Sequence, residues 1–299
     1  MLEQKTLLFQ NPITEIILRR YSCRSYRSEP VAIETQQRLQ DFMSALQAGP
    51  LGAPLRFKLL AASGSDRRAL RGLGTYGFIR GATAFIAGAV GRGEKNLEDF
   101  GYQLESAILA ATALGLGTCW LGGSFTQSSF ARKIEVTGDE MIPAVTATGY
   151  AAERSRYTRL VRRQVGADRR LPWGSLFYQG QFGIPMSAEA AGPYARPLEM
   201  VRLAPSASNK QPWRIVKVGH AWHFYLRRTP NYGPGSLVFN LMKLADLQRV
   251  DMGIAMCHFE LTARELGLEG RWAQMNPGLE SPDSAAPGAG LEYGISWVE

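Results

Sequence analysis

The sequence has little of what marks several large protein classes. It contains three cysteines and three histidines in 299 residues. Cys23, Cys119 and Cys257 stand far apart, without a Cys-x-x-Cys pair or the spacing of a zinc site. This argues against a disulfide scaffold and favours a reducing compartment. The histidines are also scattered, so we expect no metal site.

Long apolar runs are missing too. The longest, residues 82–90, is interrupted by Thr83 and Gly88 and is too short to cross a bilayer. The first residues, MLEQKTLLFQNP, do not have the pattern of a signal peptide. We therefore expect a cytoplasmic protein without a membrane partner.

The chain is basic, but it has no nucleic-acid recognition motif. Its 34 Lys and Arg against 26 Asp and Glu give a net charge of +8. The arginines form short clusters, at residues 19–20, 162–163 and 169–170, and not one basic arm. This pattern favours small anionic partners, such as cofactor phosphates, over nucleic acid.

An internal repeat organises the chain. Residues 99–120 and 251–272 align without a gap at an offset of 152 (251 − 99). They share the initial Asp, a Gly two residues later, the sequence Leu-Gly-Leu and a final Trp. Apolar residues at helical spacing predict a long helix in each, ended at the Gly by a left-handed cap.

Two further segment pairs extend the repeat. Pro54–Leu60 resembles Pro212–Val218, and residues 144–150 resemble residues 291–297; all four are typical of short strands. The order helix, strand, long helix, strand therefore occurs twice. The Gly/Pro/Ala-rich stretch at residues 178–197 separates the copies, which we expect to span residues 1–180 and 181–299.

Three polar segments stand at element ends. Residues 19–26 (RRYSCRSY) combine guanidinium groups suited to phosphate and carbonyl oxygens with hydroxyls. Residues 120–124 (WLGGS) hold paired glycines that let backbone N–H groups approach a ligand. Residues 204–214 (APSASNKQPWR) form a polar loop between a helix and a strand. Each segment also has an interpretation without a ligand. Residues 19–26 could be a solvated helix end, residues 120–124 a glycine turn, and residues 204–214 a structural loop.

In chain order these segments resemble the nitroreductase family of FMN enzymes, most closely its fused, double-length members. Residues 20–26 are similar to its Arg-x-Ser-x-Arg/Lys element, and residues 204–213 to its Ala-Pro-Ser-x-x-Asn-x-Gln-Pro-Trp element. Residues 98–123 resemble its central helix and flavin loop, and residues 143–153 its late strand. The resemblance implies an α+β, nitroreductase-like fold in which two duplicated copies pack as a pseudo-two-fold dimer.

The resemblance also implies which residues bind FMN. The first copy would provide the basic element and the flavin loop through Arg20, Tyr21, Ser22, Arg24, Trp120, Leu121, Gly122 and Gly123. Among the basic residues late in this copy, we favour Arg169 or Arg170 over Arg162 and Arg163 as the residue that binds the FMN phosphate. The second copy would provide the wall formed by Pro205, Ser206, Ala207 and Asn209.

Each copy lacks what the other keeps. In the first copy, Leu51 stands where Asn209 stands in the second (209 − 158 = 51). The second copy has no Arg-x-Ser-x-Arg element, and AQMNP follows its Trp272 in place of LGG. We therefore expect one FMN site, completed by both copies of a chain that functions as a monomer; further association is left open.

The function implied by the resemblance is ping-pong hydride transfer from NADH or NADPH, through FMN, to a nitroaromatic, quinone or related acceptor. No side chain is expected to act as a catalytic acid; Arg24 would support the reduced flavin electrostatically. One alternative is a flavin-binding protein without turnover, a sensor or store. Another is a different reaction of the family, such as dehalogenation. Two segments are candidates for a substrate lid, Ser63–Arg80 and Arg228–Gly235.

Overall fold

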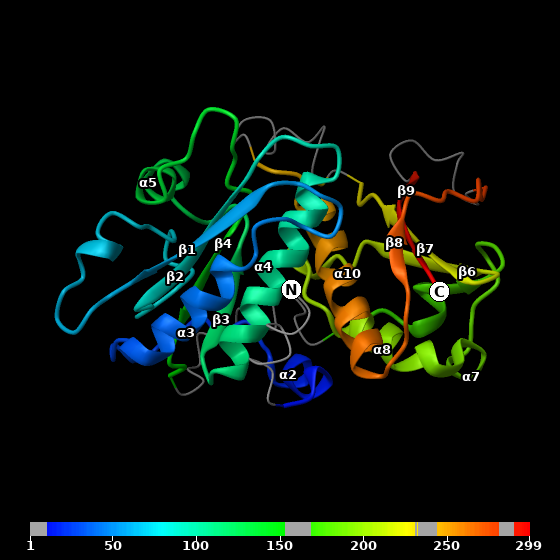
Figure 1. Ribbon diagram of the computed structural model, residues 1–299, viewed down its shortest axis with the longest axis horizontal. Helices are drawn as coiled ribbons and strands as arrows, with labels where there is room; N and C mark the ends of the chain where they lie inside the picture. The colour runs from blue at the N-terminus through cyan, green and yellow to red at the C-terminus, as the bar shows by residue number, and fades with distance from the viewer. Residues whose placement is uncertain (1–10, 153–168, 231, 233–243, 281–289) are drawn as a thin grey trace. The chain divides into compact units, whose positions relative to one another are not determined.

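The chain forms two compact units, Met1–Ala167 and Asp168–Glu299. The computed structural model describes residues 11–152, 169–230, 232, 244–280 and 290–299 (Figure 1). The units divide earlier than the sequence copies expected at residues 1–180 and 181–299. The physical reason is β5 (Phe177–Gln179), which pairs in parallel with β6 (Trp213–Val218) and so belongs to the sheet of the second unit.

The first unit is built on a four-stranded antiparallel sheet in the order β1-β2-β4-β3. The strands are β1 (Leu55–Ala61), β2 (Ala84–Val90), β3 (Gly117–Leu121) and β4 (Val145–Gly149). Every residue of β2 is buried. The apolar run at residues 82–90 thus contains a central strand covered on both faces, which explains why it shows no alternation of polar residues.

The two faces of this sheet bury two different cores. On one face, Ile86 packs with Phe100, Leu104 and Ile108 of α4 (Asn96–Ala113) and with residues of α3 (Ile33–Ser44). On the other face, the neighbouring Phe85 packs with Phe130 of α5 (Gln127–Lys133). Successive strand residues point to opposite faces, so both layers follow from the pleat.

The second unit repeats this topology. Its five-stranded sheet has the order β5-β6-β7-β9-β8, in which β7 is Ala221–Arg227, β8 Arg271–Ala273 and β9 Leu291–Val298. When β5 is left aside, the four other strands, numbered by their order along the chain, lie in the sheet as first, second, fourth, third. This is the order of the first unit, and all pairs are antiparallel. The long helix α10 (Leu247–Glu265) lies between the second and third strands. The matching topology supports the duplication inferred from the sequence.

The two long helices end in the same way, as the sequence predicted. Gly115 after α4 has φ +80° and Gly267 after α10 has φ +71°. The next residue of each, Leu116 or Leu268, donates its N–H back to the last turn, over 2.9 Å in both cases. Glycine adopts this left-handed conformation without the steric cost of a Cβ, so it ends the helix.

The strands expected from the sequence are confirmed near their predicted bounds, as β1, β4, β6 and β9. The strands β2, β3, β7 and β8 were not in the order that the sequence predicted. Among the described residues, no helix has both the length and the apolar character required to cross a membrane. The other helices in the described part of the chain are α2 (Ile13–Arg19), α7 (Ala188–Ala191) and α8 (Ala195–Leu203), with short 3-10 turns at Arg68–Leu70, Trp173–Ser175, Gly192–Tyr194 and Ala207–Asn209.

Candidate functional site

In the first unit, the basic element lies beside the strand that leads to the glycine loop. Helix α2 ends at Arg19, and the chain continues in extended conformation from Arg20 (φ −63°, ψ 130°). Ser22 bridges to Thr118 of β3 in parallel, and Cys23 donates its N–H to the Thr118 carbonyl over 2.8 Å. The structure thereby brings the predicted segments 20–24 and 120–123 together.

A buried glutamate, which sequence reasoning missed, ties these two segments to α4. The indole N–H of Trp120 donates to Glu105 Oε2 over 2.7 Å, and Arg20 Nε lies 3.6 Å from Glu105 Oε1. The side chain of Glu105 is fully buried, and that of Arg20 is 7% exposed. A buried carboxylate requires such partners. The available signal was an acidic residue inside an apolar helix.

Arg24 differs from Arg20 in its surroundings. It is half-buried, and its Nη1 is buried without a hydrogen-bond partner among the described residues. The backbone around it is fixed: Arg80 donates its N–H to the Arg24 carbonyl, and Tyr26 donates its N–H to the Arg80 carbonyl, each over 2.9 Å. A held guanidinium with an unused buried donor suits an oxygen from a bound molecule.

The flavin-loop residues divide between strand and turn. Trp120 and Leu121 are the last residues of β3, and the Leu121 side chain is buried in the core. Gly122 and Gly123 follow as a half-buried bend. The part of this segment that carries no side chain is therefore the part that leaves the sheet. Tyr21 and Ser22 are half-buried as well.

In the second unit, the loop before β6 has an unusual backbone. Ser208, Asn209 and Gln211 have φ of +49°, +54° and +48°. Residues other than glycine occupy this region at a cost, and such outliers concentrate at functional sites. Two contacts hold the loop: the Asp251 carboxylate accepts from Ala207 N–H over 2.9 Å, and Ser206 Oγ accepts from Gln211 N–H over 2.8 Å. Pro205, Ser206, Ala207 and Asn209 are half-buried.

The late arginines lie against this same loop. Asn209 Nδ2 donates to the Arg169 carbonyl over 2.9 Å, and Arg170 Nη1 donates to Asn209 Oδ1 over 3.3 Å. Arg170 Nη2 also donates to the Leu203 carbonyl over 3.0 Å. Arg170 is thus engaged in the fold, whereas the Arg169 side chain is exposed. Of the two phosphate candidates, Arg169 has the guanidinium free to meet solvent; Arg162 and Arg163 lie outside the described residues.

An aspartate near the start of each long helix anchors the loop before the first strand. Asp99 accepts from Leu51 N–H and Ala53 N–H, both over 2.8 Å, as Asp251 does from Ala207. Burial raises the pKa of Asp99 to about 6, against the lowering effect of these two hydrogen bonds. Burial also raises the pKa of Asp251 well above its usual range. Neither anchor was singled out for this role from the sequence.

Of the two lid segments considered, Ser63–Arg80 is described and connects β1 to β2, whereas half of Arg228–Gly235, residues 231 and 233–235, lies outside the described residues. The three histidines are not gathered. His223 hydrogen-bonds Ser296 over 2.7 Å, His258 bonds the Met200 carbonyl over 2.9 Å, and His220 is exposed.

These features define a class: an α+β chain in which one sheet order occurs twice, with cation-rich polar segments at the ends of buried elements. The chain belongs to the nitroreductase family, because the family model described as "Putative TM nitroreductase" matches residues 12–263. The family resemblance inferred from the sequence is thereby confirmed.

One solved structure that matches nearly the whole chain shows the same fold, and two others match about half of it. A protein of Thermotoga maritima, described as a putative nitroreductase, is 21% identical; the match covers 96% of this chain and 94% of the other, with a TM-score of 0.58. A putative nitroreductase from Desulfovibrio desulfuricans in complex with FMN is 23% identical and covers 50% of this chain and 95% of its own, with a TM-score of 0.38. A nitroreductase with bound FMN from Bacteroides fragilis is 18% identical and covers 49% and 91%, with a TM-score of 0.37. A comparison with curated protein sequences found no match.

Proposed function

We propose that this member of the nitroreductase family is an FMN-dependent oxidoreductase that transfers hydride from NADH or NADPH to a nitroaromatic, quinone or related acceptor. Family membership supports the oxidoreductase class. The observation that carries the cofactor proposal is Arg24, whose buried Nη1 has no hydrogen-bond partner among the described residues. A native protein rarely buries such a donor unless another molecule satisfies it.

The residues present fit FMN by their chemistry. Its ring system has carbonyl oxygens and ring nitrogens along one edge, which suit the unused guanidinium donor of Arg24 and the backbone of Gly122 and Gly123. Its single phosphate suits an exposed arginine such as Arg169. The Gly-x-Gly-x-x-Gly of residues 72–77 follows a 3-10 turn and leads into strand β2, whereas the motif that binds a dinucleotide joins a strand directly to a helix.

Each element would have a distinct task. Arg24 would hold a fixed positive charge where negative charge increases on reduction, and Arg20 would keep the basic element in place through Glu105. Tyr21, Ser22 and residues 120–123 would complete this side, whereas Pro205, Ser206, Ala207 and Asn209 would line the ribityl side. Bound FMN would supply the capacity to accept and return a hydride. The donor would leave before the acceptor binds, because both would use the same place.

The test uses the purified chain. We expect a yellow protein that releases FMN, and not FAD, on denaturation. It should oxidise NADH or NADPH faster when menadione is added. A colourless protein that takes up no added FMN would refute the proposal. A protein that binds FMN but leaves both nicotinamides unoxidised with every acceptor would instead be a flavin-binding protein without turnover, and the reductase assignment would be wrong.

A further inference from the structure

The segment between β1 and β2 borders an open hollow whose lining includes none of the residues proposed to bind FMN. The segment is closed at its base, where Ala62 donates its N–H to the Thr83 carbonyl over 2.9 Å. Between these ends, the chain makes an excursion over residues 63–82 and leaves a cavity of about 590 Å³. This volume is typical of sites that take small organic molecules.

Contacts at three places hold the excursion open. Gly74 and Thr126 are joined by two hydrogen bonds, of 2.9 Å to Oγ1 and 3.1 Å between backbone atoms. Lys133 of α5 donates to the Arg68 carbonyl over 2.9 Å. At the far end, Arg80 pairs with Arg24 and Tyr26 through their backbones. A segment fixed in this way is a preformed wall and does not have to be ordered by a ligand, which lowers the cost of binding.

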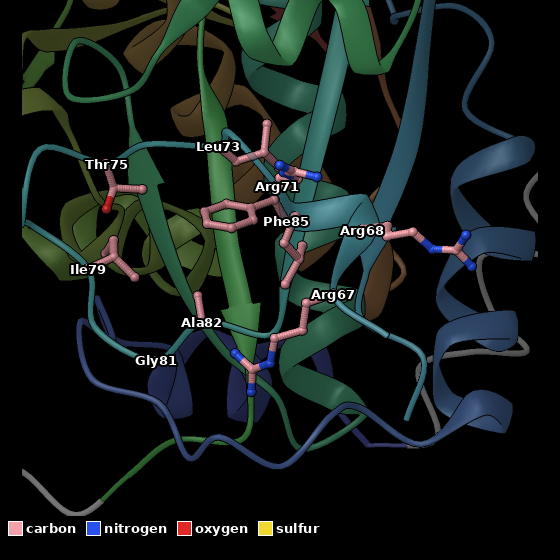
Figure 2. Close-up of a pocket in the computed structure, with 10 residues that line it drawn as sticks. Arg67, Arg68, Arg71, Leu73, Thr75, Ile79, Gly81, Ala82 and Phe85 are labelled. Atoms are coloured by element: carbon pink, nitrogen blue, oxygen red, sulfur yellow. The ribbon is translucent and has the colours of Figure 1, made fainter. Parts of the chain in front are cut away.

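The cavity has an apolar wall and a cationic rim. Carbon-rich side chains come from both the excursion and strand β2, namely Leu70, Leu73, Ile79, Ala82 and Phe85. Arginines 67, 68 and 71 are the charged residues among those that line it, and none of its lining residues is acidic. Figure 2 shows the Phe85 ring amid the side chains of the excursion, with Arg67 below it and Arg71 above it, and with Arg68 directed away.

The three arginines are not equally available. Arg68 forms an ion pair with Asp66, at 2.8 Å between Nη2 and Oδ2, so its charge is offset. Arg67 donates one hydrogen bond, from Nη2 to the Ser28 carbonyl over 3.0 Å, and its other N–H groups remain available to a ligand. Arg71 makes no side-chain hydrogen bond or ion pair within the described part of the chain. Two guanidinium groups with unused donors therefore border the apolar wall.

From this arrangement we infer a binding site for a small organic anion with an apolar body: the body lies against Ile79 and Phe85, and its carboxylate or phosphate pairs with the guanidinium group of Arg67 or Arg71. Guanidinium forks recognise both anions with two parallel hydrogen bonds. The apolar wall excludes free inorganic anions as the best ligands, since they would leave it exposed to water. The inference does not rest on the hydride transfer proposed above.

Equilibrium binding to the full-length protein, purified with its bound cofactor, tests this. Isothermal titration calorimetry would use 2-naphthoate and 2-naphthyl phosphate as anionic probes, with 2-naphthamide as the neutral control. We expect at least one anion to bind, and the amide to bind about tenfold more weakly or worse, as expected from the loss of a charge-assisted contact. The tighter of the two anions identifies the preferred head group. No binding of either anion, or equal binding of the amide, would overturn the inference.

Variants locate the probe. Arg67→Gln combined with Arg71→Gln should weaken the better anion at least tenfold, and Ile79→Glu, which adds a like charge to the apolar wall, should abolish its binding. The matched control is Arg92→Gln, which removes an exposed arginine from the turn after the other end of β2 and should have no effect. Circular dichroism and thermal melting identify variants that do not fold. Binding that survives both the double and the Ile79→Glu substitutions would place the probe elsewhere and refute the site.

Discussion

Two loops of the chain occupy the same position in the repeat and have become different. Residues 47–53 precede β1, and residues 204–212 precede β6. Asp99 holds the first through two backbone N–H groups, and Asp251 holds the second through one. In the first loop the approach is so close that a Cβ on Gly49 would overlap the Asp99 carboxyl. The anchor thus persists in both loops, whatever else they carry.

The difference lies in backbone strain and polar content. In the first loop, the positive φ is at Gly52 (+95°), where it costs little. In the second, positive φ falls on Ser208, Asn209 and Gln211, at about 1 kcal/mol or more each. Only the second loop also engages an arginine segment through an amide side chain. The first loop therefore has a relaxed backbone, whereas the loop of the proposed site keeps a costly conformation.

The largest expected effect concerns the matched tryptophans of the repeat, each of which donates to a glutamate of its long helix. Trp120 donates to Glu105 and Trp272 donates to Glu260, both over 2.7 Å, but only Glu105 also lies beside a buried arginine. Glu105→Gln keeps a hydrogen-bond acceptor and removes the charge opposite Arg20. We expect it to lower the free energy of unfolding by about 3–5 kcal/mol, as for a buried charge that loses its partner.

Urea unfolding followed by circular dichroism measures this, with Glu260→Gln as the matched variant. Its neighbour Arg264 is 34% exposed, so the expected loss is below about 1 kcal/mol. Equal losses in the two variants would show that the ion pair with Arg20 does not distinguish the units.

The next effect is the pH dependence caused by Asp99. Burial raises its pKa to about 6 in the folded chain, against about 3.9 for an unperturbed aspartate. Between these values the folded state binds more protons than the unfolded state, so stability falls as pH rises. The contribution is fully present below about pH 4 and is lost as pH passes about 6; two pKa units correspond to about 2–3 kcal/mol. Asp99→Asn should remove this part of the slope in unfolding experiments from pH 4 to 7. A variant with the parent's slope would contradict it.

A smaller effect is expected on FMN affinity from Arg24. Arg24→Ala should weaken binding by about 1.5–3 kcal/mol, the usual value for a charge-assisted hydrogen bond, without loss of stability. Arg24→Lys should restore part of it, because the charge returns without the planar fork. Quenching of flavin fluorescence on titration measures both. Arg19→Ala is the control, since Arg19 is exposed at the end of α2. Equal affinity of the Arg24→Ala variant and the parent would remove Arg24 from the site.

The sequence predicted those parts of the fold that depend on local patterns. The two long helices, their glycine caps and four strands follow from periodicity and turn residues near each other in the chain. Strand β2 was not predicted, because a strand buried on both faces does not alternate polar and apolar residues. Its apolar run therefore lacks the two-residue period of a half-buried strand. The sequence did not predict that the units divide before residue 180, because the parallel pairing of β5 with β6 joins residues far apart in sequence.

The candidate site shows the same limit. The side chains proposed to face the ligand belong to short motifs and were named from the sequence, whereas those that hold the motifs in place were not. Glu105, Asp99 and Asp251 act through tertiary contacts, and the contact between Arg170 and Asn209 spans 39 positions of the chain. Such partners can be identified only once the elements are packed.

The smallest expected effect tests the comparison of the two loops most directly. Asn209→Leu gives the second loop the residue that the first has at Leu51. It removes the side-chain amide that donates to the Arg169 carbonyl and accepts from the Arg170 guanidinium. Hydrogen bonds of this kind contribute a net free energy of about 1 kcal/mol. We expect FMN affinity to fall about fivefold, while the reverse change, Leu51→Asn, leaves it unaltered, because that loop carries no arginine segment to engage.

In both variants and the parent, titration should saturate at one FMN per chain, since the basic element and the Pro-Ser-x-x-Asn loop each occur once in the sequence. Saturation at two FMN per chain, or a second flavin gained with Leu51→Asn, would show that the first loop had not lost its binding role.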